Sequence, residues 1–330
     1  MTQRISIAQV PDVQSQLPSI ALGLSRVGVR GVEKVIRIRQ KGTEQLFSAQ
    51  IECFVDLGPE QKGAHMSRFE EVINEAIGEV ILGESGFRAE QLAQHIAELV
   101  RGRQNALRAE VTIAARYPEH RPAPVSGINT QEIYTLFGIA VASGRGTRRV
   151  VGVAAQGMTA CPCAQQLIAA QAREHLEEDG FSDGEIERIL AVVPIATHNQ
   201  RGLGTLHVGV PEGQELEIEA HALLAIVENS MSSEIYELMK RSDEAAVVAR
   251  AHARPRFVED CVREMIAGVI AGLPQLADSA FISARQENLE TIHQHNVEAE
   301  RQGTLGELRR ELAGGEHALS HTTMRAWLDG

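Results

Sequence analysis

Hydrophobic and polar residues alternate along several stretches of the chain, and this period of two is typical of strands with one buried face. Residues 26–39 (RVGVRGVEKVIRIR) show the alternation, and residues 46–57 repeat it after QKGT at 40–43, which suits a hairpin turn. The same pattern predicts further strands at 106–117, 131–142, 148–156, 203–210 and 280–288.

Other stretches place hydrophobic residues three or four positions apart, which is the spacing of one helical face. One predicted helix has Ser182 as its N-cap, with Glu185 three residues later as in a capping box. Residues 1–20 show little periodicity and are expected to form an extended arm, and residues 301–330 are expected to form a polar, Gly-interrupted tail. The predicted helices are 67–82, 88–102, 164–179, 182–193, 219–239 and 256–273.

The order of these elements in the first half is strand, strand, helix, helix, strand, strand, and the second half repeats it with an insertion. This order predicts an α+β fold of two tandem ββααββ modules, with antiparallel sheets and helices on one face. We expect an arm and first module at 1–145, a second module at 146–300 and a tail at 301–330, with the boundary in the turn at 143–146. A Gly-rich phosphate loop of Walker or Rossmann type is missing from the strand-to-helix junctions, which disfavours an ordinary nucleotide-binding domain.

Composition narrows the class of protein. Hydrophobic residues make up 43% and charged residues 23%, which predicts a soluble globular chain, and no apolar run approaches the ~20 residues of a membrane span. A net charge of −12 argues against nucleic acid as a partner. The N-terminus lacks the pattern of a secretory signal and the 4 cysteines are too few for a disulfide framework, so we expect a cytoplasmic protein with reduced thiols.

Candidate metal ligands gather in the second half of the chain. Cys161-Pro-Cys163 places two thiols on a rigid turn, because the proline fixes its own φ and favours an extended conformation at Cys161. A thiolate, an imidazole and a carboxylate or second imidazole make a ligand set for a divalent transition metal, although two cysteines also occur as small buried side chains. The other donors offered by the sequence are His198, Glu244, His293 and His295.

Short motifs along nearly the whole chain resemble those of the GTP cyclohydrolase IB family, the metal-dependent alternative to the ordinary zinc GTP cyclohydrolase of folate synthesis. One departure is a segment of about 34 residues between Cys163 and His198, longer than the family spacing. The matching motifs, in order, are Pro11-Asp-Val-Gln14, Val27-Gly-Val29, Ser48-Ala-Gln-Ile-Glu-Cys-Phe-Val-Asp56, Lys62-Gly-Ala-His-Met-Ser-Arg68, Cys161-Pro-Cys163, His198-Asn-Gln-Arg201, Lys240-Arg-Ser-Asp-Glu244, Phe257-Val-Glu-Asp260 and Glu287-Asn-Leu-Glu-Thr-Ile-His293.

The resemblance implies a tunnelling fold (T-fold), a homotetramer with active sites at subunit interfaces, and conversion of GTP to formate and 7,8-dihydroneopterin triphosphate, the first step of tetrahydrofolate synthesis. It also implies one divalent ion per site, which we expect to be Zn, Mn or Fe. The implied metal ligands are Cys161, His198, Glu244 and His293, and the implied catalytic residues are Cys161, His198 and Glu259.

Several further residues are implied as substrate contacts. A carboxylate such as that of Glu259 accepts two parallel N–H bonds from the guanine edge, although an acid at a helix start is also favoured by the macrodipole. Cys163 has either a packing role or a role in proton transfer. His293 and His295 alternate on a stretch expected to be extended, so one faces each way. The remaining substrate contacts are Lys62, His65, Ser67 and Arg68 for triphosphate or ribose, Arg201 for phosphate, and His295.

Two other functions compete with this interpretation. An archaeal-type GTP cyclohydrolase shares these motifs and ends in a 2′,3′-cyclic phosphate of dihydroneopterin. A protein of another class, a zinc-stapled structural oligomer, would use the same Cys and His residues in a closed four-ligand site. A zinc base deaminase is disfavoured because neither H-x-E nor P-C-x-x-C occurs in the chain.

Overall fold

The computed structural model describes residues 12–40, 43–80, 88–214, 218–315 and 320–330. By their contacts these divide into two compact units. Unit 1 comprises the described residues within Met1–Ala115, Phe137–Val150 and Leu328–Gly330, and unit 2 those within Arg116–Leu136 and Val151–Trp327. Residues 1–11 of the expected arm, 41–42 of the expected hairpin turn and 81–82 of the first predicted helix lie outside the described residues.

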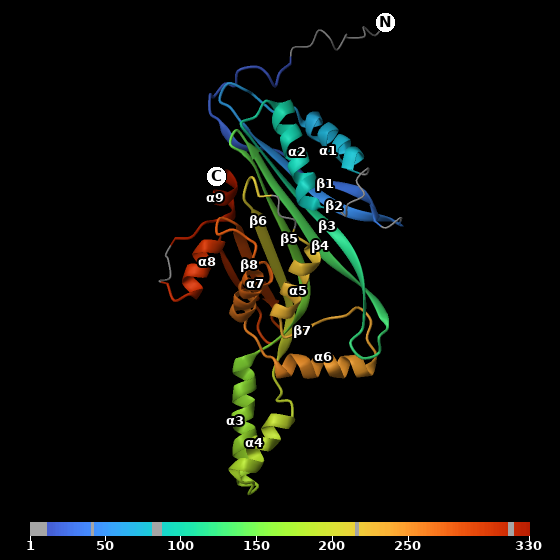
Figure 1. The fold of residues 1–330 in the computed structure, drawn as a ribbon, viewed down its shortest axis with the longest axis vertical. Coiled ribbons are helices and arrows are strands. Elements are labelled where there is room, and N and C mark those ends of the chain that lie inside the picture. Colours follow the sequence, from blue (N-terminus) through green and yellow to red (C-terminus); the bar gives the residue numbers. More distant parts are fainter. Residues whose placement is uncertain (1–11, 41–42, 81–87, 215–217, 316–319) are drawn as a thin grey trace. The chain divides into compact units, whose positions relative to one another are not determined.

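Unit 1 is built on an antiparallel strand pair with two helices packed on it (Figure 1). The apolar faces of the helices, including Phe69 and Ile96, are buried together with inward-facing strand residues such as Ile51 and Ile113, because each element must cover one hydrophobic face. The elements are β1 (Leu24–Gln40), β2 (Thr43–Leu57), α1 (Met66–Val80), α2 (Ala89–Gln104) and parts of β3 (Arg108–Pro122), β4 (Asn129–Ser143) and β5 (Gly146–Ala160).

Unit 2 has a core in which α5 (Ala220–Ser230) and α7 (Val258–Gly272) pack on each other, α5 against β6 (Asn199–Val210) and α7 against β8 (Phe281–Leu289). Leu223 and Met265 of the helices, and Leu206 and Phe281 of the strands, are fully buried in this core. The other elements of unit 2 are α3 (Pro162–Glu178), α4 (Asp183–Val192), β7 (Ser233–Glu234), α6 (Arg241–Ala253), β9 (Val297–Thr304), α8 (Leu305–Leu312) and most of α9 (Met324–Asp329).

The predicted fold class, a tunnelling fold of two tandem ββααββ modules, is wrong. Among the residues that the structure describes, nine strands form one sheet in the order β1-β2-β3-β4-β5-β6-β8-β9, with β7 paired to β5. The second half runs β5, α3, α4, β6, α5, β7, α6, α7, β8, β9, which does not repeat the first half. Periodicity identified most strands, but hydrogen-bond pairing across the sheet is set by tertiary contacts that a single strand pattern does not encode.

One predicted helix differs from the structure in length, and other elements were missed. The helix predicted at 219–239 ends at Ser230, and the next residues include β7. The Ser230 hydroxyl donates to the Val227 carbonyl at 2.6 Å and the Ser233 hydroxyl to the Glu234 carbonyl at 3.1 Å, and such local bonds compete with a continuing helix. The helix α6 and the strand β9 were not predicted. In the described part of the expected polar tail at 301–330 lie the end of β9, α8 capped by Thr304, and α9.

The insertion between β5 and β6 is a helical hairpin of α3 and α4, as the pattern predicted (Figure 1). Ser182 is the N-cap of α4, and Glu185 accepts its backbone N–H at 2.9 Å. No residue of α3 is buried, and Ile186 is the buried residue of α4. Within the described parts of the chain, no helix has both the length and the apolar character needed to span a membrane.

Candidate functional site

Cys161 lies where β5 ends and α3 begins. Its backbone is extended, with φ −75° and ψ 117°, and Pro162 occupies the first turn of α3, so the predicted effect of the proline on Cys161 is confirmed. Cys161 is partly exposed and Cys163, one residue into the helix, is exposed. Both thiols are therefore accessible at the N-terminus of this helix.

Backbone contacts bring Cys161 next to His198. The Cys161 N–H donates to the His198 carbonyl at 3.1 Å, and the Thr197 hydroxyl donates to the Cys161 carbonyl at 2.7 Å. The end of β5, at Cys161, and the start of β6, just after His198, therefore lie next to each other. The long segment between the cysteines and His198, which departs from the family spacing, is the α3–α4 hairpin and does not separate the two residues in space.

A group of imidazoles surrounds His198. Its ring lies 6.2 Å from that of His293 in an edge-on arrangement, and His293 stacks on His295 at 5.3 Å. The Nδ1 atom of His198 is 3.9 Å from Oε2 of Glu290, and both atoms are buried without a hydrogen-bond partner in the described structure. The prediction that His293 and His295 face opposite ways is wrong, because residues 291–295 form bends between β8 and β9 and the strand period does not apply to them.

The donor chemistry around His198 suits a divalent ion, since thiol, imidazole and carboxylate are all present and two buried polar atoms lack partners. The arrangement is incomplete, however. Among the described residues, no three His, Cys, Asp or Glu side chains lie close enough together to hold one metal ion. This conformation of the single chain therefore offers suitable donors without an assembled ligand set.

Glu244 and Glu259, two other predicted site residues, both lie in the first turn of a helix, α6 and α7 respectively. Both are exposed. Such positions are also favoured for carboxylates by the helix macrodipole. Within the described structure, these two carboxylates are therefore not part of the group around His198.

The predicted substrate contacts Lys62, His65 and Arg68 belong to unit 1. Nε2 of His65 lies 2.9 Å from Oδ2 of Asp12, and the Arg68 guanidinium donates to the Arg103 carbonyl at 3.1 Å. Lys62 and Ser67 are exposed. These residues are assembled at the start of α1, and the remaining predicted site residues belong to unit 2.

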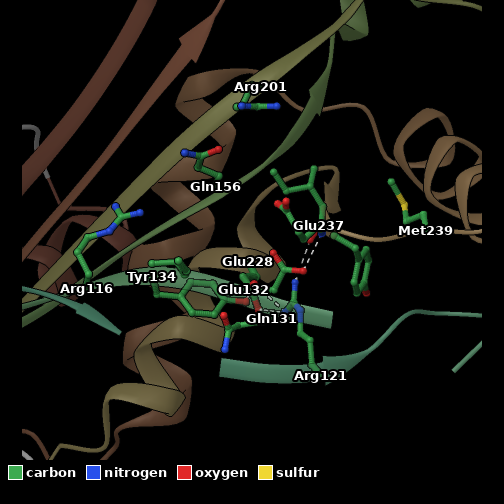
Figure 2. Close-up of a pocket in the computed structure, with 13 residues that line it drawn as sticks. Arg116, Arg121, Gln131, Glu132, Tyr134, Gln156, Arg201, Glu228, Glu237 and Met239 are labelled. Atoms are coloured by element: carbon green, nitrogen blue, oxygen red, sulfur yellow. Dashed lines mark hydrogen bonds and ion pairs between the residues drawn. The ribbon is translucent and has the colours of Figure 1, made fainter. Parts of the chain in front are cut away.

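A cavity of about 710 Å³ lies within unit 2 between the strands and the segment that follows β7 (Figure 2). Arg201, a predicted phosphate contact, lines it from β6. The other polar residues of the wall come from β3, β4, β5, α5 and the 235–239 segment: Arg116, Arg121, Gln131, Glu132, Tyr134, Gln156, Glu228, Tyr236 and Glu237.

One wall of the cavity is a partly buried ion pair. The Arg121 guanidinium donates to Glu228 at 2.8 Å, and the Tyr134 hydroxyl donates to the same carboxylate at 2.9 Å. Arg121 also lies 4.8 Å from the centre of the Tyr236 ring, within range of a cation–π contact. Burial raises the pKa of Glu228 although Arg121 opposes the shift, and burial also raises the pKa of Tyr134.

Sequence reasoning missed this wall. A usable signal was present, since Glu228 stands in the apolar run of α5 (AHALLAIVENS), where a carboxylate requires a partner. Its partner Arg121 is 107 residues earlier, between two predicted strands, so the pair was not identifiable from spacing.

The model of the type I GTP cyclohydrolase folE2 family (GCHY-1) matches residues 10–299 of this chain. A GTP cyclohydrolase MptA of Methanococcus maripaludis is 42% identical over 311 residues, covering 92% of this chain and 98% of that protein. A GTP cyclohydrolase MptA of Methanosarcina barkeri is 40% identical over 312 residues, covering 92% and 97%. These matches confirm that the chain resembles GTP cyclohydrolases, as the motifs predicted.

Among solved structures, the uricase of Arthrobacter globiformis matches with a TM-score of 0.51 and 8% identity over 94% of this chain and 99% of that chain. A hyper-thermostable AgUricase mutant matches with a TM-score of 0.52 and 8% identity over 94% and 98%. At this identity the likeness concerns the fold alone. Because the family model matches most of the chain and the relatives are 40–42% identical over nearly their whole length, this chain belongs to the type I GTP cyclohydrolase folE2 family.

Proposed function

We propose that this chain hydrolyses GTP, releasing formate and forming 7,8-dihydroneopterin triphosphate. The observation that carries the proposal is the family match over residues 10–299 together with relatives named GTP cyclohydrolase at 40–42% identity. The juxtaposition of Cys161, His198 and His293 gives the chain a group of side chains suited to this chemistry.

We further propose one divalent ion, Zn, Mn or Fe, held by Cys161, His198, Glu244 and His293. When bound, such an ion supplies a nucleophile for C8 of guanine by lowering the pKa of its water. The chain's own contribution is orientation: the bonds of Thr197 and His198 to the Cys161 backbone hold this residue at the end of β5, beside His198. Since the four donors are not assembled in the described single chain, the proposal requires Glu244 to move or a ligand to draw the donors together.

The base is proposed to be selected by Glu259, whose carboxylate accepts the paired N–H groups of guanine. The exposure of this side chain in the first turn of α7 leaves it accessible to a ligand.

Three finer points stay predictions: that the chain belongs to the IB type of GTP cyclohydrolase, that it forms a tetramer, and that its product is the triphosphate. An archaeal-type reaction ending in a 2′,3′-cyclic phosphate is the alternative, and chromatographic identification of the pterin product separates the two.

The deciding experiment follows formate release from GTP. Protein stripped by a chelator should remain folded by circular dichroism and release no formate, and adding back Zn, Mn or Fe one at a time should restore turnover with one of them. Turnover by the stripped protein would refute the metal requirement. Unfolding on chelation would instead favour a zinc-stapled structural protein, since a closed structural site contributes folding energy. Absence of formate with every ion would refute the cyclohydrolase activity.

A further inference from the structure

We propose that Arg116, together with Arg201, binds the phosphate groups of the nucleotide in the cavity of unit 2. Arg116 carries no predicted role from the sequence motifs, and the assignment rests on the proposed function, because GTP is the polyphosphate in question. The cavity of about 710 Å³ supplies the space, and the strands supply the cations.

Arg116, Gln156 and Arg201 are exposed polar residues that stand next to buried residues in their strands. In β5, Gln156 is exposed while its neighbours from Val150 to Gly157 are buried. In β6, Arg201 is exposed between the buried residues Gln200 and Gly202, and in β3 Arg116 is exposed directly after the buried Ala115. Figure 2 shows Arg116, Gln156 and Arg201 along one side of the cavity, facing the wall formed by Arg121 and Glu228.

The charges in the cavity leave these two arginines available. Three arginines and three glutamates line it, but Arg121 and Glu228 are bound to each other. Glu132 accepts hydrogen bonds from the Thr130 hydroxyl and the Glu237 N–H, each at 2.8 Å, which disperse its charge. Within the described part of the chain, neither Arg116 nor Arg201 has a carboxylate at ion-pair distance, so both guanidinium groups are free to take a phosphate in a bidentate manner.

The position of the cavity along the strands fits an extended nucleotide. Arg201 is the third residue after His198, which corresponds to roughly 10 Å along a strand. Gln156 is five residues before Cys161 on β5, the strand whose end meets His198. β6, which carries Arg201, and β5, which carries Gln156, both run from the cavity to the place where Cys161 and His198 meet, so the proposal is that one extended nucleotide spans the two.

Binding of inorganic tripolyphosphate, measured by calorimetry at low ionic strength, tests this site separately from catalysis. Wild-type protein should bind one tripolyphosphate per subunit, and Arg116→Gln and Arg201→Gln should each weaken binding roughly tenfold to a hundredfold, the range expected for loss of a charged hydrogen bond. Arg188→Gln, at an exposed arginine of α4, is the matched control and should bind as the wild type does. Arg116→Lys retains the charge and should recover part of the affinity.

Kinetics with GTP complete the test. Arg116→Gln should raise KM for GTP tenfold or more with a smaller change in kcat, because phosphate contacts are made in both ground and transition states. Tripolyphosphate binding by Arg116→Gln with wild-type affinity, or its absence in the wild type, would overturn the phosphate site. If the wild type binds tripolyphosphate through Arg116 but releases no formate from GTP, the cyclohydrolase proposal fails while the anion site stands.

Discussion

Two cysteines in this chain show how environment decides what a residue does. Cys161 is partly exposed beside His198, whereas Cys53 is fully buried on β2, where burial raises the pKa of its thiol to about 12. Only a thiolate is a good nucleophile or metal ligand, so Cys53 is chemically inert in the fold.

Replacing Cys161 with Ala should therefore reduce formate release from GTP to background while leaving the melting temperature close to that of the wild type. The matched change Cys53→Ala should leave turnover intact and lower the free energy of unfolding by about 1–2 kcal/mol through a small cavity. Formate assays and denaturant titrations on both variants provide the measurement. Wild-type turnover in Cys161→Ala would remove this residue from the site.

The Arg121–Glu228 pair yields a prediction about stability. Arg121→Met should cost about 3 kcal/mol, because it leaves a buried carboxylate with only Tyr134 as a donor. Combining it with Glu228→Gln, which removes the charge and keeps an acceptor for Tyr134, should recover most of that loss. Urea denaturation of the single and double variants measures both values, and a double variant as unstable as Arg121→Met would contradict the explanation.

The pH dependence of Arg121→Met follows from the raised pKa of Glu228. A carboxyl whose native pKa is raised contributes stability below its ordinary pKa and loses it as pH rises through the native value. Without Arg121 that native pKa rises further. In urea titrations at several pH values, the free energy of unfolding that Arg121→Met loses relative to wild type should thus be largest where Glu228 is ionised, at neutral and alkaline pH, and should shrink as pH falls and the carboxyl is protonated.

At the scale of elements, one carboxylate ties α6 to the connection between β3 and β4. Asp243, fully buried at the start of α6, accepts the N–H groups of Val125, Ser126 and Lys240, each at 2.8 Å, and the Ser126 hydroxyl at 2.7 Å. Burial alone would raise the pKa of Asp243, but these hydrogen bonds outweigh it and hold that pKa well below its usual range.

We predict that Asp243→Asn lowers the melting temperature at pH 7, since an amide N–H₂ then faces backbone donors. A carboxyl with a lowered native pKa contributes stability above its ordinary pKa of ~3.9 and loses it as pH falls through the native value. The difference in melting temperature between wild type and Asp243→Asn should accordingly narrow only in strong acid. Asp183→Asn, at an exposed position of α4, is the control, and an equal shift in both variants would refute the role of Asp243.

At the scale of the whole molecule, the sheet order leaves β1 and β9 as its two end strands. Unpaired strand edges are usually covered in native proteins, and association of identical subunits is one way to cover them. The number four comes from the resemblance to the GTP cyclohydrolase IB family, which implies a tetramer, so light scattering should give a mass near four times the 35.9 kDa of one chain. A monomer that retained full GTP turnover at micromolar concentration would contradict the predicted tetramer.

The sequence determined most strands, most helices and the motifs that placed the chain among GTP cyclohydrolases, because periodicity and short motifs are local properties. It also determined the turn chemistry of Cys161, since Pro162 acts on its immediate neighbour. Only the tertiary structure decided that the α3–α4 hairpin returns His198 to Cys161, that the strands join one sheet, and that Glu228 meets Arg121 across 107 residues. These are long-range pairings, and their selection depends on which buried faces and charges satisfy each other after the chain has folded.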